Sequence, residues 1–120
     1  MNQGKTVDKT KLIRGYKAGK DEGKPRFSLI PADVLKEVAK VFTQGAKKYD
    51  DRNFEKGIPY SELLDAMHRH WTDVACRTDI DPEWNLHHLA HLICDAMMMM
   101  RIQNLVKRGI LEDRFDDREV

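Results

Sequence analysis

Two histidines and an aspartate, His88, His91 and Asp95, are spaced three and four residues apart in the last third of the chain. In an α-helix of 3.6 residues per turn, this spacing places the three side chains within an arc of roughly 60°. Such a stripe can act as a general base, hold a metal ion or form a polar network that fixes helix packing. The sequence leaves these three alternatives open.

The loop before this stripe is acidic and could supply further metal ligands through Asp79, Asp81 and Glu83. Mg²⁺ prefers such oxygen ligands and usually also binds substrate phosphates. Zn²⁺ would need His88 and His91 directly, and two histidines three residues apart are weak support for that.

Cationic and aromatic side chains that suit a nucleotide occur in the first half of the chain. Arginine binds phosphate through two parallel hydrogen bonds and lysine acts as a point charge, while aromatic rings can stack on a base. No glycine-rich phosphate loop is present, so side chains on helices would have to hold a nucleotide. The candidates are Lys24, Arg26, Lys47, Lys48 and Arg52 for phosphate, and Phe27, Tyr49, Phe54 and Trp84 for stacking.

Three amphipathic segments must position these residues. The first helix is expected from residue 32 after Pro31, with Gly45 interrupting or bending it; the second from an N-cap at Ser61 to about Arg77. The third is expected from about Leu86 to Arg108, with Gly109 as its stop signal. No credible strand pair is found. The pattern predicts an all-α fold, a small helical bundle of three main helices.

Length and composition exclude several classes of protein. The chain has 120 residues with 21 basic and 20 acidic side chains, and 41% of it is hydrophobic. No apolar run approaches the roughly 20 residues of a membrane span, and the first residues lack the pattern of a signal peptide. Two cysteines are too few for a disulfide framework. We therefore expect a cytoplasmic protein without a membrane partner.

Charge is distributed unevenly along the chain. Residues 1–26 carry eight basic and three acidic side chains, whereas residues 111–120 carry two basic and five acidic ones. A basic arm suggests an anionic partner, but four glycines and little aromatic content make nucleic acid an unlikely one. The predicted organisation is a basic, partly flexible arm (1–26), a helical nucleotide-binding domain (27–110) and an acidic tail (111–120).

Four consecutive methionines, residues 97–100, cover every side of one turn of the third helix. That turn cannot have a solvent-facing side without exposing apolar surface, and methionine usually fills irregular gaps in a core. Three helices in a chain of this length also bury little surface alone. We therefore expect the bundle to be completed by homo-oligomerisation, as a dimer or a tetramer.

Four segments in order resemble a known family: residues 24–31 (KPRFSLIP), 44–57 (QGAKKYDDRNFEKG), 67–71 (MHRHW) and 79–96 (DIDPEWNLHHLAHLICDA). They are similar to the phage-borne dATP/dGTP diphosphohydrolases, which resemble the MazG-like all-α nucleoside triphosphate pyrophosphohydrolases. The resemblance implies cleavage of purine deoxynucleoside triphosphates to monophosphate and pyrophosphate, in the host cytoplasm if the protein is viral.

The resemblance also implies roles for residues. Asp79, Asp81 and Asp95 are the expected ligands of Mg²⁺ or Mn²⁺, and His88 and His91 the expected catalytic residues, which orient ligands or the attacking water. The expected substrate-binding residues are Lys24, Arg26, Phe27, Lys48, Tyr49, Arg52, Asn53 and His70.

Two positions depart from the family pattern, because Ser28 and Thr78 stand where the family has Asp and Glu. Binding needs only cations and a stacking surface, whereas hydrolysis needs a filled metal shell. A phage protein that binds or sequesters a nucleotide without cleaving it is therefore the alternative function.

Overall fold

The computed structural model describes residues 13–15, 17 and 23–119. These fall into two units, residues 1–31 and residues 32–120. In the first unit, η3 (Phe27–Leu29) is a short 3-10 helix closed by a 3.0 Å hydrogen bond from the Leu29 amide to the Arg26 carbonyl. Most of the predicted basic arm lies outside the described residues.

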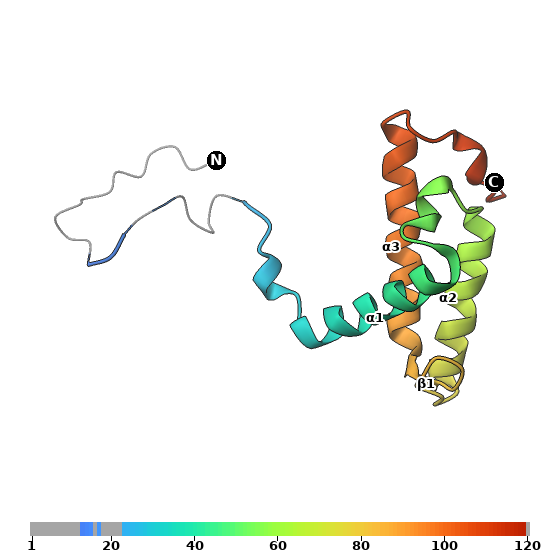
Figure 1. Cartoon of the computed structure of the whole chain (residues 1–120), viewed down its shortest axis with the longest axis horizontal. Coiled ribbons are helices and arrows are strands. Elements are labelled where there is room, and N and C mark those ends of the chain that lie inside the picture. Colours follow the sequence, from blue (N-terminus) through green and yellow to red (C-terminus); the bar gives the residue numbers. More distant parts are fainter. Residues whose placement is uncertain (1–12, 16, 18–22, 120) are drawn as a thin grey trace. The chain divides into compact units, whose positions relative to one another are not determined.

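The second unit is built from three helices, which confirms the all-α bundle. They are α1 (Ala32–Tyr49), α2 (Tyr60–Ala75) and α3 (His88–Lys107). Figure 1 shows α2 and α3 side by side and antiparallel, with α1 crossing near them. No helix among residues 13–15, 17 and 23–119 is long and apolar enough to cross a membrane.

Helix α1 buries Val38 and Val41 and carries Lys47 and Lys48 in its last turn, where basic groups complement the helix dipole. The expectation was an interruption or a bend at Gly45; the helix runs through this residue without a break, so the interruption is wrong. A glycine inside a helix costs about 1 kcal/mol, which is too little to stop a helix that is held by packing.

Two groups of buried residues form the core between the helices. One joins Val38 and Val41 of α1 to α3 and the segment before it (Leu86, Ala90 and Cys94). The other joins α2 to α3 and the C-terminal segment (Tyr60, Leu63, Ile102 and Phe115). Met98 packs against both groups, which fits the gap-filling role of methionine.

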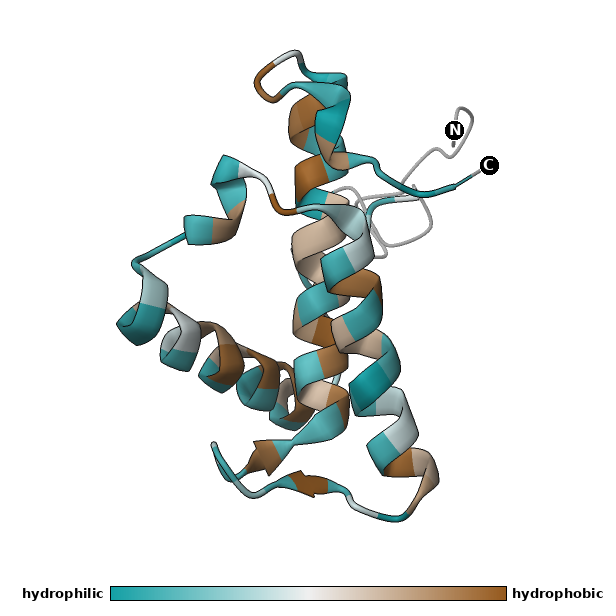
Figure 2. Ribbon diagram, turned by 90° about the vertical axis from the view of Figure 1, so that its right-hand side faces the viewer, coloured by the Kyte–Doolittle hydropathy of each residue, from teal (hydrophilic) through white to brown (hydrophobic). Residues whose placement is uncertain are grey.

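The methionine run faces in several directions, as expected from its sequence. Met98 and Met99 are half-buried against the core, whereas Met97 and Met100 are 44% and 64% exposed. Figure 2 shows that apolar residues occur on more than one side of α3. The exposed pair leaves apolar surface at one side of the helix, and homo-oligomerisation stays a prediction.

A short antiparallel strand pair, β1 (Ile80–Asp81) and β2 (Leu86–His87), connects α2 to α3, so the expectation of no strand pair is wrong. Asn85, at φ +56°, lies in the turn between the strands. Helix α3 begins at His88, two residues later than expected, and the side chain of His87 accepts a hydrogen bond from the Leu89 amide at 3.0 Å. Helix α3 ends at Lys107, and Gly109 follows shortly after it at φ +72°, in agreement with its predicted role as a stop signal.

Helix α2 begins at Tyr60 after Pro59, so the expected N-cap at Ser61 is wrong. The amide and hydroxyl of Ser61 instead donate hydrogen bonds to the carboxylate of Asp117, at 2.9 and 2.5 Å. A carboxylate there satisfies a free amide in the first turn of the helix. The acidic C-terminal segment therefore packs on α2, with η5 (Asp113–Phe115) burying Phe115.

Candidate functional site

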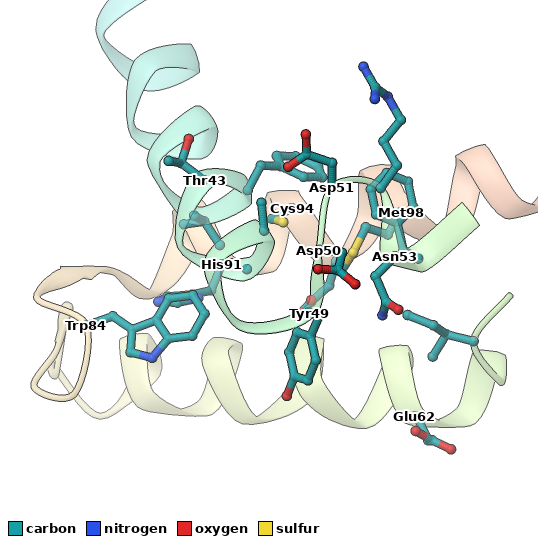
Figure 3. Close-up of a pocket in the computed structure, with 18 residues that line it drawn as sticks. Thr43, Tyr49, Asp50, Asp51, Asn53, Glu62, Trp84, His91, Cys94 and Met98 are labelled. Atoms are coloured by element: carbon teal, nitrogen blue, oxygen red, sulfur yellow. The ribbon is translucent and has the colours of Figure 1, made fainter. Parts of the chain in front are cut away.

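The second unit contains a cavity of about 860 Å³. Helix α1 contributes its last two turns, the loop and short 3-10 helix η4 (Asn53–Lys56) contribute another wall, and α2, α3 and the β1–β2 turn complete it (Figure 3). This volume is within the usual range for small-molecule sites. Its polar and aromatic lining residues are Thr43, Tyr49, Asp50, Asp51, Arg52, Asn53, Glu62, His91 and Asp95, with Phe42, Phe54 and Trp84.

One side of the cavity is formed by a tight turn between α1 and η4. Asp50 and Arg52 both have positive φ, at 83° and 54°. The turn is closed by a hydrogen bond of 3.4 Å from the Asn53 amide to the Asp50 carbonyl. Aspartate tolerates the left-handed region better than most side chains, whereas a left-handed arginine is strained, and such strain is concentrated at functional sites.

His91 projects from α3 into the same cavity and is only 8% exposed. Its ring stacks on that of His70, with centroids 4.6 Å apart and planes at 7°, and lies 5.3 Å from the Trp84 ring. Its Nε2 atom is 3.2 Å from Asp81 Oδ2. Within the described residues this buried nitrogen has no hydrogen-bond partner.

Asp81 is held in place by its own backbone, since its Oδ1 accepts a 3.0 Å hydrogen bond from the Glu83 amide. The other oxygen is thereby turned toward His91. Burial lowers the pKa of His91, although the Asp81 carboxylate raises it in part. The result is a neutral imidazole beside an oriented carboxylate, an arrangement that suits proton transfer.

His70 and His88 form the second layer of this histidine cluster. Their Nδ1 atoms are 2.8 Å apart, so one ring donates and the other accepts. The far nitrogen of His88, Nε2, lies 3.5 Å from Asp73 Oδ2. Burial, together with the neighbouring His91 and His88, lowers the pKa of His70 to about 4. The helices are thus joined by a polar network next to the cavity.

Asp95 lines the cavity one helical turn beyond His91. Its Oδ2 atom is buried and has no hydrogen-bond partner among the described residues. Burial raises the pKa of this carboxyl to about 7, with the charge of Arg69 acting in the opposite direction. A shifted carboxyl in a cavity is typical of a functional site.

The structure brings part of the predicted site together. Tyr49, Arg52, Asn53, His91 and Asp95 line the cavity. His70, His88 and Asp81 lie behind its wall through their contacts with His91 or with one another.

Lys48 and Asp79 belong to the second unit but do not line the cavity. The Lys48 ammonium group is 5.1 Å from the centroid of the Tyr49 ring, but Lys48 does not line the cavity. Asp79 is exposed and takes part through its backbone carbonyl, which accepts from the His88 amide at 2.7 Å. Lys24, Arg26 and Phe27 belong to the first unit, where Phe27 is 79% exposed.

Sequence reasoning did not select four polar residues of the cavity: Thr43, Asp50, Asp51 and Glu62. A signal for two of them was present, because Asp50 and Asp51 directly precede Arg52 and Asn53, which were selected. Glu62 lies in the first turn of α2, where an acidic residue also has an ordinary role in stabilising a helix. Only the approach of α2 to the turn gives it a place at the cavity.

A divalent cation needs several oxygen ligands around one point. In the part of the chain that the structure describes, no three His, Cys, Asp or Glu side chains are grouped so that they could hold a metal ion. The unpartnered Asp95 oxygen is one suitable ligand, but the described residues of one chain do not fit a complete site. The binding of Mg²⁺ or Mn²⁺ by Asp79, Asp81 and Asp95 stays a prediction.

The fold and cavity define a small three-helix protein with a site of histidines, carboxylates and aromatic rings. Residues 14–114 match the family described as dATP/dGTP diphosphohydrolase, N-terminal, and the chain belongs to this family. A dATP/dGTP diphosphohydrolase of Salmonella phage PMBT28 is 37% identical over 94 residues, which are 78% of this chain and 31% of that protein. The chain thus spans about a third of the length of that relative. No solved structure matches this chain.

Proposed function

We propose that the chain takes part in hydrolysing purine deoxynucleoside triphosphates to the monophosphate and pyrophosphate. The name of the phage relative and the family description support this activity. The observation that carries the proposal for this chain is the pair of His91 and Asp81 at the cavity. His91 Nε2 lies 3.2 Å from Asp81 Oδ2, and His91 is deeply buried.

The histidine would act as the base that activates water. A neutral imidazole carries one proton, so one ring nitrogen of His91 stays free to accept a proton from water. The water oxygen bonds to phosphorus while the bridging bond between the α and β phosphates breaks. The proton of the water passes to His91, and the pyrophosphate leaves with the bridging oxygen. Mg²⁺ or Mn²⁺ would supply charge neutralisation for the phosphates when bound.

The test is the release of pyrophosphate from dGTP and dATP, with Mg²⁺ and with Mn²⁺. His91→Gln should lower kcat by about 10²- to 10⁴-fold, the usual contribution of a general base, and Asp81→Asn should lower it less. His68→Gln is the matched control, because His68 is an exposed histidine of α2 that does not line the cavity. Full activity of His91→Gln, or release of orthophosphate or triphosphate instead, would contradict the proposal.

The alternative is a nucleotide-binding protein that does not cleave its ligand. One observation favours it: in the part of the chain that the structure describes, no three metal-binding side chains gather. A nucleotide that raises the melting temperature without any release of pyrophosphate would support this function. For both functions we propose the host cytoplasm as the location and a dimer or tetramer as the working form.

A further inference from the structure

We propose that His70 is a positioning residue, which holds the ring of His91 in a fixed plane by stacking on it. This inference rests on the proposed function, in which His91 activates water. Sequence reasoning gave His70 a contact with the substrate, whereas the stack gives it an indirect role: a side chain of α2 acts through a side chain of α3.

The polar contacts of His91 do not fix the plane of its ring. Its Nε2 atom lies 3.2 Å from Asp81 Oδ2, but it has no hydrogen-bond partner among the described residues. A general base works only when its accepting nitrogen lies within hydrogen-bond reach of the water, and a misplaced reacting group loses much of its rate. The orientation of this imidazole must therefore come from its packing.

The ring of His70 supplies that packing. Its centroid is 4.6 Å from the centroid of His91, and the two planes differ by 7°. The ring of Trp84 lies 5.3 Å from His91 at 55°, and the ring of His88 lies 6.3 Å away at 45°. Among the aromatic neighbours that the structure describes, His70 is thus the one whose ring is parallel to His91. Rotation of His91 out of this plane would break the stacked contact.

His70 is itself held by a hydrogen bond to a buried side chain. Its Nδ1 atom is 2.8 Å from His88 Nδ1. His88 is 5% exposed and begins α3, where its amide donates a hydrogen bond to the Asp79 carbonyl at 2.7 Å. Residues that are locked by packing and hydrogen bonds in this way can hold a functional side chain in its productive geometry. The ring that faces His91 is therefore anchored to both α2 and α3.

The charge of His70 suits this position. Burial, together with the neighbouring His91 and His88, lowers the pKa of His70 to about 4, so its ring is neutral near pH 7. A neutral ring can stay stacked when His91 becomes positively charged, because the face of an aromatic ring attracts a cation. A charged ring at the same distance would repel it.

The experiment compares His70→Gln with His70→Phe in the release of pyrophosphate from dGTP, with Mg²⁺ or Mn²⁺. Glutamine can keep a hydrogen bond to His88 but has no ring, whereas phenylalanine keeps the flat ring and loses the hydrogen bond. His70→Gln should lower kcat by about tenfold to a hundredfold, the cost of a misplaced reacting group, and should change KM by less than about twofold. His70→Phe should recover most of the lost kcat.

His68→Gln is the matched control. His68 is an exposed histidine of the same helix and does not line the cavity, so this variant should keep the kcat and KM of the parent. Circular dichroism shows whether each variant is folded.

A measurement without turnover tests the stack itself. In isotope-labelled protein, the ring current of His70 should shift the ring-proton NMR signals of His91 upfield of those of the exposed His68. The upfield shift should persist in His70→Phe and be lost in His70→Gln.

The outcomes separate this inference from the proposed function. Parental kcat in a folded His70→Gln variant, a raised KM with parental kcat, or equal kcat in His70→Gln and His70→Phe overturns the positioning role. Absence of the upfield shift in the parent chain also overturns it, even if the His70 variants do not fold. An upfield shift in a parent chain that releases no pyrophosphate supports the stack and contradicts hydrolysis.

Discussion

The aromatic ring of Phe115 occupies the space that a side chain at position 57 would fill. Gly57 has φ +99° at the end of η4, where the chain turns toward α2. Phe115 is only 7% exposed and packs with Tyr60 and Leu63. The C-terminal segment thus fixes the backbone between two parts of the cavity wall, Phe54 and Ile58.

Gly57→Ala should therefore lower the free energy of unfolding by about 2–4 kcal/mol, because it combines an unfavourable φ with overpacking against Phe115. Chemical denaturation measures this change. Gly109→Ala is the control, since Gly109 also has positive φ but none of the described residues places an atom within 4 Å of the added carbon, and it should cost only about 1 kcal/mol. Equal losses of stability in the two variants would show that the contact with Phe115 adds nothing to the cost of Gly57→Ala.

The raised pKa of Asp95, about 7, makes stability depend on pH. The folded state holds this proton up to about pH 7, whereas the unfolded state loses it near pH 4. The contribution of Asp95 to stability is therefore fully present below pH 4 and is lost as pH rises through 7. Asp95→Asn should remove this loss and be more stable than the parent by roughly 2–4 kcal/mol at pH 8, measured without divalent ions. Asp113→Asn, an exposed carboxyl, should show no such gain. A stability difference between Asp95→Asn and the parent that does not change with pH would contradict the raised pKa of Asp95.

The lowered pKa of His70, about 4, has the opposite effect. The unfolded state takes up this proton below pH 6.5 and the folded state does so only near pH 4, so stability is lost as pH falls through this window. Thermal melts at several pH values should show a smaller loss in His70→Gln than in the parent. His68→Gln, at an exposed histidine, should keep the parental slope. An identical slope in His70→Gln would rule out this origin of acid sensitivity.

Neighbouring methionines of α3 should respond differently to a charge. Met99→Asp places a carboxylate against the core of Tyr60 and Ile102 and should cost about 2–4 kcal/mol of stability. Met100→Asp changes a side chain that is 64% exposed and should leave the melting temperature nearly unchanged. Light scattering of Met100→Asp also tests the predicted oligomer, because a charge on an interface should lower the mass in solution. Unchanged mass would exclude this side of α3 as the contact.

Much of the fold follows from local sequence patterns. The periodic apolar residues of three segments predicted the three helices, and Gly109 predicted the end of the last one, because these features depend on neighbouring residues only. The spacing of His88, His91 and Asp95 likewise placed them on one side of α3. The family resemblance was confirmed by a match over residues 14–114.

Tertiary contacts decided the rest. Gly45 stays helical, Ser61 binds Asp117 across 56 positions in sequence, and the acidic C-terminal segment packs on α2. Only the meeting of α1, α2 and α3 shows that Asp50 and Glu62 line the same cavity as His91. Sequence spacing sets which residues share a face of one helix, but the distance between two elements depends on how their side chains pack. That packing separates Asp79 from the cavity and brings Asp81 to His91.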